Sequence, residues 1–150
     1  MSILVIQDNK KARFDYEILE VIEAGIVLMG SEVKSLRDKN IQLKDSYVTF
    51  SNGEAYLQNA HISPYQASSY NNHAPERLRK LLLNRKEINQ MMGKVQERGL
   101  SIVPLKIFFK KGLVKLDLGI VRGKKAHDKR QSIKERESNK SLKQTLRHSR

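Results

Sequence analysis

Apolar and polar residues alternate in two stretches of the chain, 41–50 and 54–62, which flank Ser51-Asn52-Gly53. Alternation places every second side chain on the same face of a strand. Asn-Gly between two such runs favours the tight turn of a β-hairpin. The sequence therefore predicts a hairpin over residues 41–62.

A second hairpin is predicted over 100–109 and 113–121, around Lys110-Lys111-Gly112. In its second arm one face carries only aliphatic side chains, those of Val114, Leu116, Leu118 and Ile120. Lys115 and Asp117 fall on the opposite face. One face should therefore pack in a core while the other meets solvent or a ligand.

Three further elements are predicted from residue type and spacing. Residues 16–28 are rich in Ile, Val and Leu and are interrupted at Ala24-Gly25, which indicates a strand, a bend and a second strand. Ser31 is a plausible N-cap for a short helix ending near Arg37. Residues 76–98 carry apolar side chains at three- and four-residue spacing before Gly99, which predicts the longest helix.

Strands joined by short hairpins, with two helices against them, are typical of an antiparallel β-barrel. We therefore expect a mainly β chain with helices, resembling the oligonucleotide-binding barrel. The barrel should occupy residues 1–122, and a basic C-terminal tail should occupy residues 123–150.

Positive charge is concentrated in that tail. The 150-residue chain carries a net charge of +13, and residues 122–150 alone hold eleven Lys and Arg against three Asp and Glu, a net +8. Such a block favours a polyanionic partner, because Lys and Arg on phosphates release condensed counterions. The tail lacks the apolar face of a membrane-surface helix, so nucleic acid is favoured over a membrane. With few aliphatic side chains to bury, the tail is expected to be disordered when free.

Asn9-Lys10-Lys11-Ala12-Arg13-Phe14-Asp15-Tyr16 places three cations beside two aromatic rings. A solvated N-terminal turn and a phosphate contact with a ring packed nearby are both compatible with this stretch. Composition alone favours the solvated turn.

The sequence shows no pattern that indicates enzymatic chemistry. The chain has no cysteine, and its four histidines, His61, His73, His127 and His148, are scattered without metal-ligand spacing. Residues 25–31 have glycines at phosphate-loop spacing, but Ser31 stands where that loop requires lysine. We expect no enzyme, no cofactor and no metal. The absence of cysteine and of a leader-like or membrane-spanning apolar run fits a cytoplasmic protein.

Several short motifs, taken together in this order, resemble the small protein B family, the tmRNA- (SsrA-) binding proteins of bacteria. They are Asn-Lys-Lys-Ala-Arg at 9–13 with Tyr16, Glu-Ala-Gly at 23–25, Gly-Ser-Glu-Val-Lys-Ser-Leu-Arg at 30–37, Asp-Ser-Tyr-Val at 45–48, Arg-Lys-Leu-Leu-Leu at 79–83, Gly-Lys-Lys at 123–125 and Asp-Lys-Arg at 128–130. The resemblance covers nearly the full chain. Gln42 and Ser138 depart from the family's usual Asn and aromatic residues.

This resemblance implies a role in trans-translation. A family member binds the tRNA-like domain of tmRNA and, with elongation factor Tu and GTP, brings it to stalled ribosomes. Its tail then folds as a helix in the empty mRNA channel of the small subunit, next to the decoding centre. The protein would act as a monomer. Without the resemblance, the main alternative is a generic structured-RNA-binding protein, such as a ribosomal protein or RNA chaperone.

The resemblance also assigns residues by position. Contact with tmRNA, or support of that contact, is implied for Asn9, Lys10, Lys11, Arg13, Tyr16, Glu23, Leu82 and Lys115. Lys124 and Lys125 would hold the junction against RNA, His127 would reach the decoding centre, and Asp128, Lys129 and Arg130 would orient the tail helix. Glu23 would accept from base or ribose donors or hold a neighbouring lysine. Leu82 would pack on RNA or support the site from the core.

Overall fold

The computed structural model describes residues 3–65, 72–96 and 100–124. Its strands are β1 (Ile3–Asp8), β2 (Tyr16–Ile26), β3 (Ile41–Gln42), β4 (Tyr47–Ser51), β5 (Glu54–Gln58), β6 (His61–Ile62), β7 (Arg79–Leu82), β8 (Leu100–Lys110) and β9 (Leu113–Gly123). Its helices are α1 (Lys10–Asp15), α2 (Gly30–Arg37) and α3 (Arg85–Gln96). The predicted tail from Lys125 onward lies outside the described residues.

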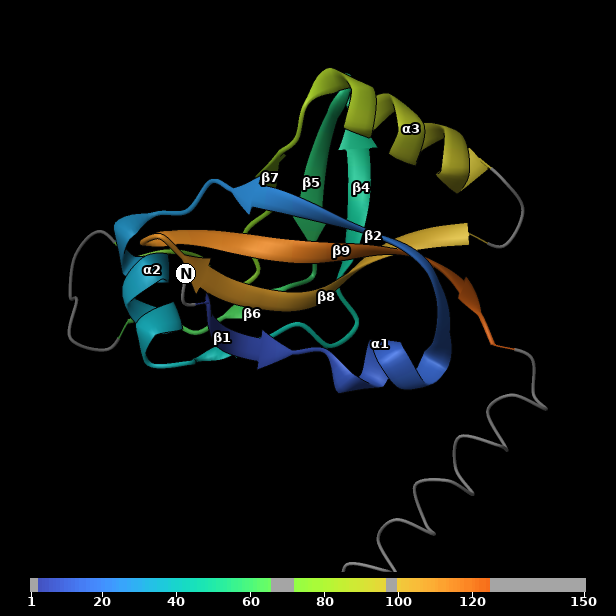
Figure 1. The fold of residues 1–150 in the computed structure, drawn as a ribbon. Coiled ribbons are helices and arrows are strands. Elements are labelled where there is room, and N and C mark those ends of the chain that lie inside the picture. The colour runs from blue at the N-terminus through green and yellow to red at the C-terminus, as the bar shows by residue number, and fades with distance from the viewer. Residues whose placement is uncertain (1–2, 66–71, 97–99, 125–150) are drawn as a thin grey trace, which may run out of the picture.

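Seven strands form one antiparallel sheet in the order β1-β8-β9-β2-β7-β5-β4, and β3 pairs with β6 beside it. The sheet curls so that β4, at one edge, packs against β8. Figure 1 shows α1 and the end of β9 on one side of the barrel, with α2 and the β8–β9 turn on the other. The predicted fold class, mainly antiparallel β with flanking helices, is confirmed.

Both hairpin predictions are confirmed in their turn geometry. Asn52 and Gly53 have φ values of +52° and +76°, and Lys111 and Gly112 have values of +53° and +76°. Two consecutive positive φ angles are the signature of the turn that matches the right-handed twist of paired strands. The first hairpin is shorter than predicted, because β3 and β6 pair separately from β4 and β5.

The apolar side chains form two cores. The larger is built from the inner faces of the strands and includes Leu57, Leu81, Ile107 and Leu116, each at most 1% exposed. The smaller lies between α1 and the sheet, where Ala12 packs with Val103, Leu105 and Val121. This second core holds α1 on the barrel. The stretch around Lys10 is therefore an anchored helix rather than the solvated turn that composition favoured.

Three sequence predictions are wrong in detail. The helix predicted over 76–98 is in fact strand β7 followed by helix α3, because Arg79 and Leu81 are buried in the sheet while Lys80 and Leu82 are exposed. The bend predicted at Ala24-Gly25 is absent. Strand β2 runs through it to Ile26, and its only irregularity against β9 lies between Ile18 and Glu20. Helix α2 begins at Gly30, so its N-cap is Met29 and not Ser31.

Candidate RNA-binding surface

The residues implied for RNA binding form two groups at opposite ends of β2. Strand β2 begins at Tyr16, which pairs with Gly123, and nine residues later Gly25 pairs with Lys115 on β9 and Leu82 on β7. At about 3.3 Å per residue, the two points are roughly 30 Å apart along the strand. We call them the α1 end, with Lys10, Lys11, Arg13, Tyr16 and Lys124, and the β7 end, with Glu23, Leu82 and Lys115. Figure 1 shows the two ends on opposite sides of the barrel.

Asn9 is a structural residue of the α1 end. It is 6% exposed, and its side-chain oxygen accepts from the backbone N–H of Ala12 at 3.2 Å, which caps the helix. Its amide nitrogen donates to the carbonyls of Pro104 at 2.8 Å and Leu43 at 3.4 Å. The side chain is thus occupied by the protein itself, so Asn9 can support RNA binding only by fixing α1 on β8.

Helix α1 displays cations that do not help it fold. Lys10 and Lys11 stand in its first turn, where no acidic residue is present, although the positive end of a helix dipole disfavours cations. Both are exposed, as is Arg13. Within the described residues the side chain of Lys10 has no hydrogen-bond or ion-pair partner. Such a placement favours a ligand of negative charge over a role in helix stability.

Two of these cations are oriented by carboxylates. Lys11 Nζ lies 2.7 Å from Asp45, and Arg13 Nε lies 3.1 Å from Asp8. The hydrogen bond from Lys11 lowers the pKa of Asp45, and the same contact raises the pKa of Lys11. Both pairs are exposed to solvent, so each contributes little to stability and serves mainly to position its cation.

The last described residue, Lys124, is fixed to α1. Its backbone N–H donates to the carbonyl of Asp15 at 3.1 Å, and its Nζ lies 5.9 Å from the centre of the Phe14 ring. Tyr16 packs beside them against the smaller core. The point at which the chain leaves the barrel is therefore next to the exposed lysines of α1.

At the β7 end, the register of three strands brings the residues together. Leu82 is 54% exposed, whereas its neighbour Leu81 is 1% exposed and belongs to the core. Leu82 lies across Gly25, where a Cβ atom would come within 3.2 Å of the Leu82 Cβ. Of the two alternatives for Leu82, the structure favours a surface contact over a core role.

The charges of the β7 end are divided between one ion pair and one lysine without a partner. Glu23 accepts from Lys110 Nζ at 3.2 and 3.3 Å, so this carboxylate holds a neighbouring lysine, one of the two roles considered for it. Lys115 has no side-chain partner in the described part of the chain. Its charge is therefore available to a phosphate.

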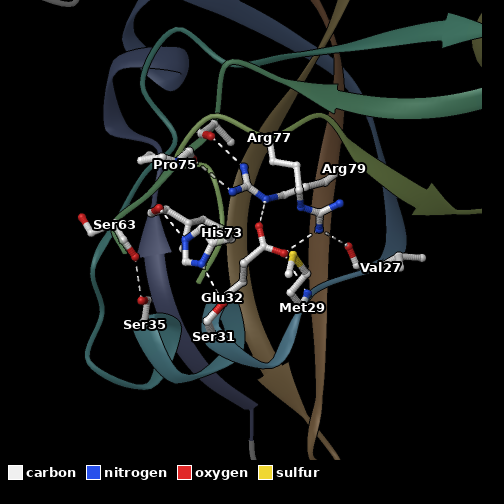
Figure 2. A network of polar contacts seen from close by, with 12 residues as sticks. Val27, Met29, Ser31, Glu32, Ser35, Ser63, His73, Pro75, Arg77 and Arg79 are labelled. Atoms are coloured by element: carbon white, nitrogen blue, oxygen red, sulfur yellow. Dashed lines mark hydrogen bonds and ion pairs between the residues drawn. The ribbon is translucent and has the colours of Figure 1, made fainter. Parts of the chain in front are cut away.

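A buried ionic network that the sequence did not reveal stands behind the β7 end (Figure 2). The side chains of Glu32 on α2 and Arg79 on β7 are both 0% exposed and form an ion pair. Arg79 also donates to the carbonyls of Ala60 at 2.8 Å and Pro75 at 3.0 Å. Arg77 donates to the other Glu32 oxygen at 2.5 Å. The network ties β7 to α2 and to the segment that precedes the strand.

Glu32 stays ionised in this setting. Burial alone would raise its pKa, but hydrogen bonds from Arg77, the Met29 N–H and Arg79 outweigh burial and hold the pKa below its ordinary value. Next to it, His73 Nε2 lies 2.8 Å from the carbonyl of Ile62. A carbonyl only accepts, so Nε2 carries the proton, and Nδ1 accepts from the Ser31 hydroxyl at 2.9 Å. Ser31 thus fixes the loop residue His73 instead of capping α2.

The remaining sequence predictions concern the first residues of the tail, metal sites and membrane-spanning segments. Lys125, His127, Asp128, Lys129 and Arg130 lie outside the described residues. Among residues 3–65, 72–96 and 100–124, no three His, Cys, Asp or Glu side chains are grouped so that they could hold a metal ion. No helix in the same ranges is long and apolar enough to cross a membrane.

Comparison with known proteins identifies a family that covers nearly the whole chain. The family model "SmpB protein" matches residues 6–148. The SsrA-binding protein of Bdellovibrio bacteriovorus is 58% identical over 149 residues, which cover 99% of this chain and 98% of that protein. The SsrA-binding protein of Syntrophobacter fumaroxidans is 58% identical over 138 residues, or 92% of this chain and 86% of the relative.

A solved structure gives the same result for the fold. A chain from the structure described as "tmRNA-SmpB: a journey to the center of the bacterial ribosome" is similar with a TM-score of 0.70 and 48% sequence identity. The match covers 85% of this chain and 93% of that chain. The similarity therefore extends over most of the barrel and not only over the short motifs.

Proposed function

This chain belongs to the SmpB family, and we propose that its RNA-binding residues are divided between the two ends of β2, each of which faces a different RNA. The chain is a tmRNA- (SsrA-) binding protein of trans-translation and ribosome rescue, with tmRNA and the ribosome as its partners. It is an RNA-binding factor and not an enzyme. Different residues of the chain are proposed to bind tmRNA and the ribosome.

We assign the β7 end to the tRNA-like domain of tmRNA. Lys115 offers a charge without a partner, Leu82 offers an exposed apolar side chain, and the pair of Glu23 with Lys110 offers an acceptor and a donor. Structured RNA presents phosphates, ribose hydroxyls and unstacked bases, which these three kinds of group can bind. The buried network behind β7 keeps their backbone positions fixed.

We assign the α1 end to the small ribosomal subunit, in place of the tmRNA contact that the resemblance implied for its residues. The observation that carries this assignment is the position of Lys124, which is bonded to α1 and is the point from which the tail leaves the barrel. The tail is proposed to lie in the empty mRNA channel, with Lys125, His127, Asp128, Lys129 and Arg130 at its start near the decoding centre. The surface around the tail's exit must then face the same subunit, and that surface carries Lys10, Lys11 and Arg13.

The resemblance to the family supports the remaining features of the proposed role. The protein acts as a monomer in the cytoplasm and reaches the ribosome with tmRNA, elongation factor Tu and GTP. Binding by residues 1–122 would be selective for tmRNA. A generic structured-RNA-binding protein would instead bind ordinary tRNA equally well.

Two charge-matched variants test the division. We expect Lys115→Ala to weaken binding to the tRNA-like domain about fivefold or more, the effect of losing one hydrogen bond to a charged group. Lys10→Ala should leave that binding within about twofold and instead lower tagging on stalled ribosomes. Binding is measured by gel shift at near-physiological salt with ordinary tRNA in excess, and tagging in a reconstituted translation reaction. The proposal is wrong if Lys10→Ala weakens tmRNA binding as much as Lys115→Ala does.

A further inference from the structure

A groove of about 680 Å³ lies at the α1 end, between α1, the start of β2, strand β4 and the start of β8. One of its walls is the segment Asp45-Ser46-Tyr47-Val48, of which the α1 end uses only Asp45, the partner of Lys11. A volume of several hundred Å³ is that of an ordinary small-ligand site. The groove is therefore large enough for a compact planar group and has no role in the function described so far.

The walls of the groove are aromatic and aliphatic. Tyr16 comes from the start of β2, and Tyr47 and Phe50 come from β4. Buried Ile102 and Val103 of β8 form part of the lining, 2% and 4% exposed. Aromatic side chains of this kind bind RNA bases by stacking, and stacking tolerates any base.

Two hydroxyl groups in the groove make no hydrogen bond to the described part of the chain. Thr49 on β4 and Ser101 on β8 both line it, and within the described residues neither hydroxyl makes a hydrogen bond. By contrast, the hydroxyl of Ser46 is already donated to the carbonyl of Leu43. Two unused hydroxyls from facing strands can bind the edge of a planar ligand.

The charges of the groove indicate which part of a nucleotide would enter. Asp15 and Asp45 line it with Lys11, which is paired with Asp45. Carboxylates repel phosphates but accept hydrogen bonds from the amino groups of bases. A phosphate is better placed outside the groove on Lys10, which is exposed on α1. The lining therefore favours a base over the sugar-phosphate backbone.

We propose that this groove binds one unstacked RNA base that carries an exocyclic amino group, with the adjoining phosphate on Lys10. The inference rests on the proposed RNA-binding function and deepens it, because it adds base recognition to the α1 end. Because the α1 end is assigned to the small ribosomal subunit, the base belongs to the RNA of that subunit, and the tRNA-like domain of tmRNA is the alternative source. The chemistry is the same for both, and the experiment separates them.

The test is chemical probing with dimethyl sulfate, which methylates the Watson–Crick edge of unpaired adenine and cytosine, and with kethoxal, which modifies that edge of unpaired guanine. The full-length protein is bound to the tRNA-like domain in one arm and to small subunits with tmRNA in the other. We expect the unmodified protein to protect one adenine, cytosine or guanine in the RNA of the small subunit. Tyr47→Ala should abolish that protection, while Tyr47→Phe, which keeps the ring, should retain it. Protection of a base in the tRNA-like domain instead would overturn the assignment of the α1 end to that subunit.

A second groove variant and the two lysine variants described above complete the design. Thr49→Val removes a hydroxyl without changing the shape of the side chain, and it should reduce the protection without altering the circular dichroism spectrum. Loss of the stacked base should weaken binding to the RNA that supplies it by about fivefold to a hundredfold. The inference is overturned if no protected base in either RNA depends on Tyr47. If Lys10→Ala and Lys115→Ala also have no effect in either arm, the proposed function itself has failed.

Discussion

The α1 end and the β7 end both carry exposed groups suited to RNA, but they are built in different ways. The α1 end takes most of its residues from one contiguous segment, Asn9–Tyr16, which a buried cap and one alanine hold on the sheet. The β7 end takes Glu23, Leu82 and Lys115 from three strands that are far apart in sequence. A local helix can shift as a unit, whereas a site built on strand register moves only if the sheet does. The β7 end is therefore the more rigid of the two.

The largest effect should come from shortening the chain at the α1 end. A chain that ends at Gly123 loses Lys124 and the tail, but it keeps the whole β7 end. We expect binding to the tRNA-like domain to stay within about twofold and ribosome-dependent tagging to fall to background. Gel shift and a tagging reaction measure the two steps. Loss of RNA binding on truncation would show that the two ends do not work separately.

Breaking the buried network should destabilise the β7 end. Glu32→Ala leaves Arg79 buried without its counter-charge, and such a change costs about 3–5 kcal/mol of unfolding free energy. Glu54→Ala is the matched control, because Glu54 pairs with Lys80 of the same strand at 3.8 Å on the surface. The control should cost at most about 1 kcal/mol. Urea unfolding gives both values, and amide hydrogen exchange shows whether β7 opens before α1.

The same network predicts a pH dependence with a definite sign. The pKa of Glu32 is lower in the folded chain than its ordinary value of 4.5. The stabilisation is therefore complete above the pKa of the unfolded chain and is lost as pH falls through the lower, folded-state pKa. The Glu32→Ala variant should therefore lose less unfolding free energy than the unmodified protein as the pH falls through this range. If the unfolding free energy of the variant falls with decreasing pH as steeply as that of the unmodified protein, Glu32 is not ionised in the folded protein.

Two adjacent leucines distinguish packing from RNA contact. Leu81→Ala opens a cavity in the core and should cost about 2–5 kcal/mol of stability. Leu82→Ala removes an exposed side chain and should cost less than about 1 kcal/mol, yet it should weaken binding to the tRNA-like domain. Thermal unfolding and gel shift on both variants provide the comparison. If Leu82→Ala binds RNA normally, the β7 end does not include this residue.

The smallest effect should come from the cap of α1. Asn9→Ala removes the N-cap and should cost about 0.5–2 kcal/mol. It should lower tagging more than tmRNA binding, because it loosens only the α1 end. Asn9→Asp keeps an acceptor for the Ala12 N–H but cannot donate to Pro104, so it should be intermediate. Equal loss of both activities would mean that the ends are coupled through the fold.

The contrast between the two ends also explains what sequence could predict. The hairpins were predictable, because Asn-Gly and Lys-Gly turns and alternating strands are local signals. Residues Asn9–Tyr16 were recognisable as a group because they are contiguous. The β7 end depends on the register of β2, β7 and β9, which no local pattern encodes. Lys115 could be placed on an open strand face by alternation, but Glu23 and Leu82 were found only through the resemblance to a known family.

The error at β7 has a specific physical cause. The triplet Leu81–Leu83 joins the apolar stripe of α3 at helical spacing, so periodicity extended the helix backward over the strand. Arg79 lies in β7 because its buried guanidinium pairs with the buried carboxylate of Glu32. That burial could not be seen from the sequence. Glu32 lies in the first turn of α2, where a carboxylate is usual and gives no sign of being buried. Two charges 47 positions apart cannot be paired from sequence alone.

Strand β2 also determines the distance between the two RNA sites. Its ladder with β9 fixes their separation in whole residues, and each residue added or removed would turn the following side chains to the other face of the sheet. Outside the irregularity between Ile18 and Glu20, the spacing can therefore change only in steps of two residues, about 6.6 Å, and only if β9 changes by the same amount. Insertions and deletions in this family should accordingly be confined to the connections between elements, while the length of β2 stays constant.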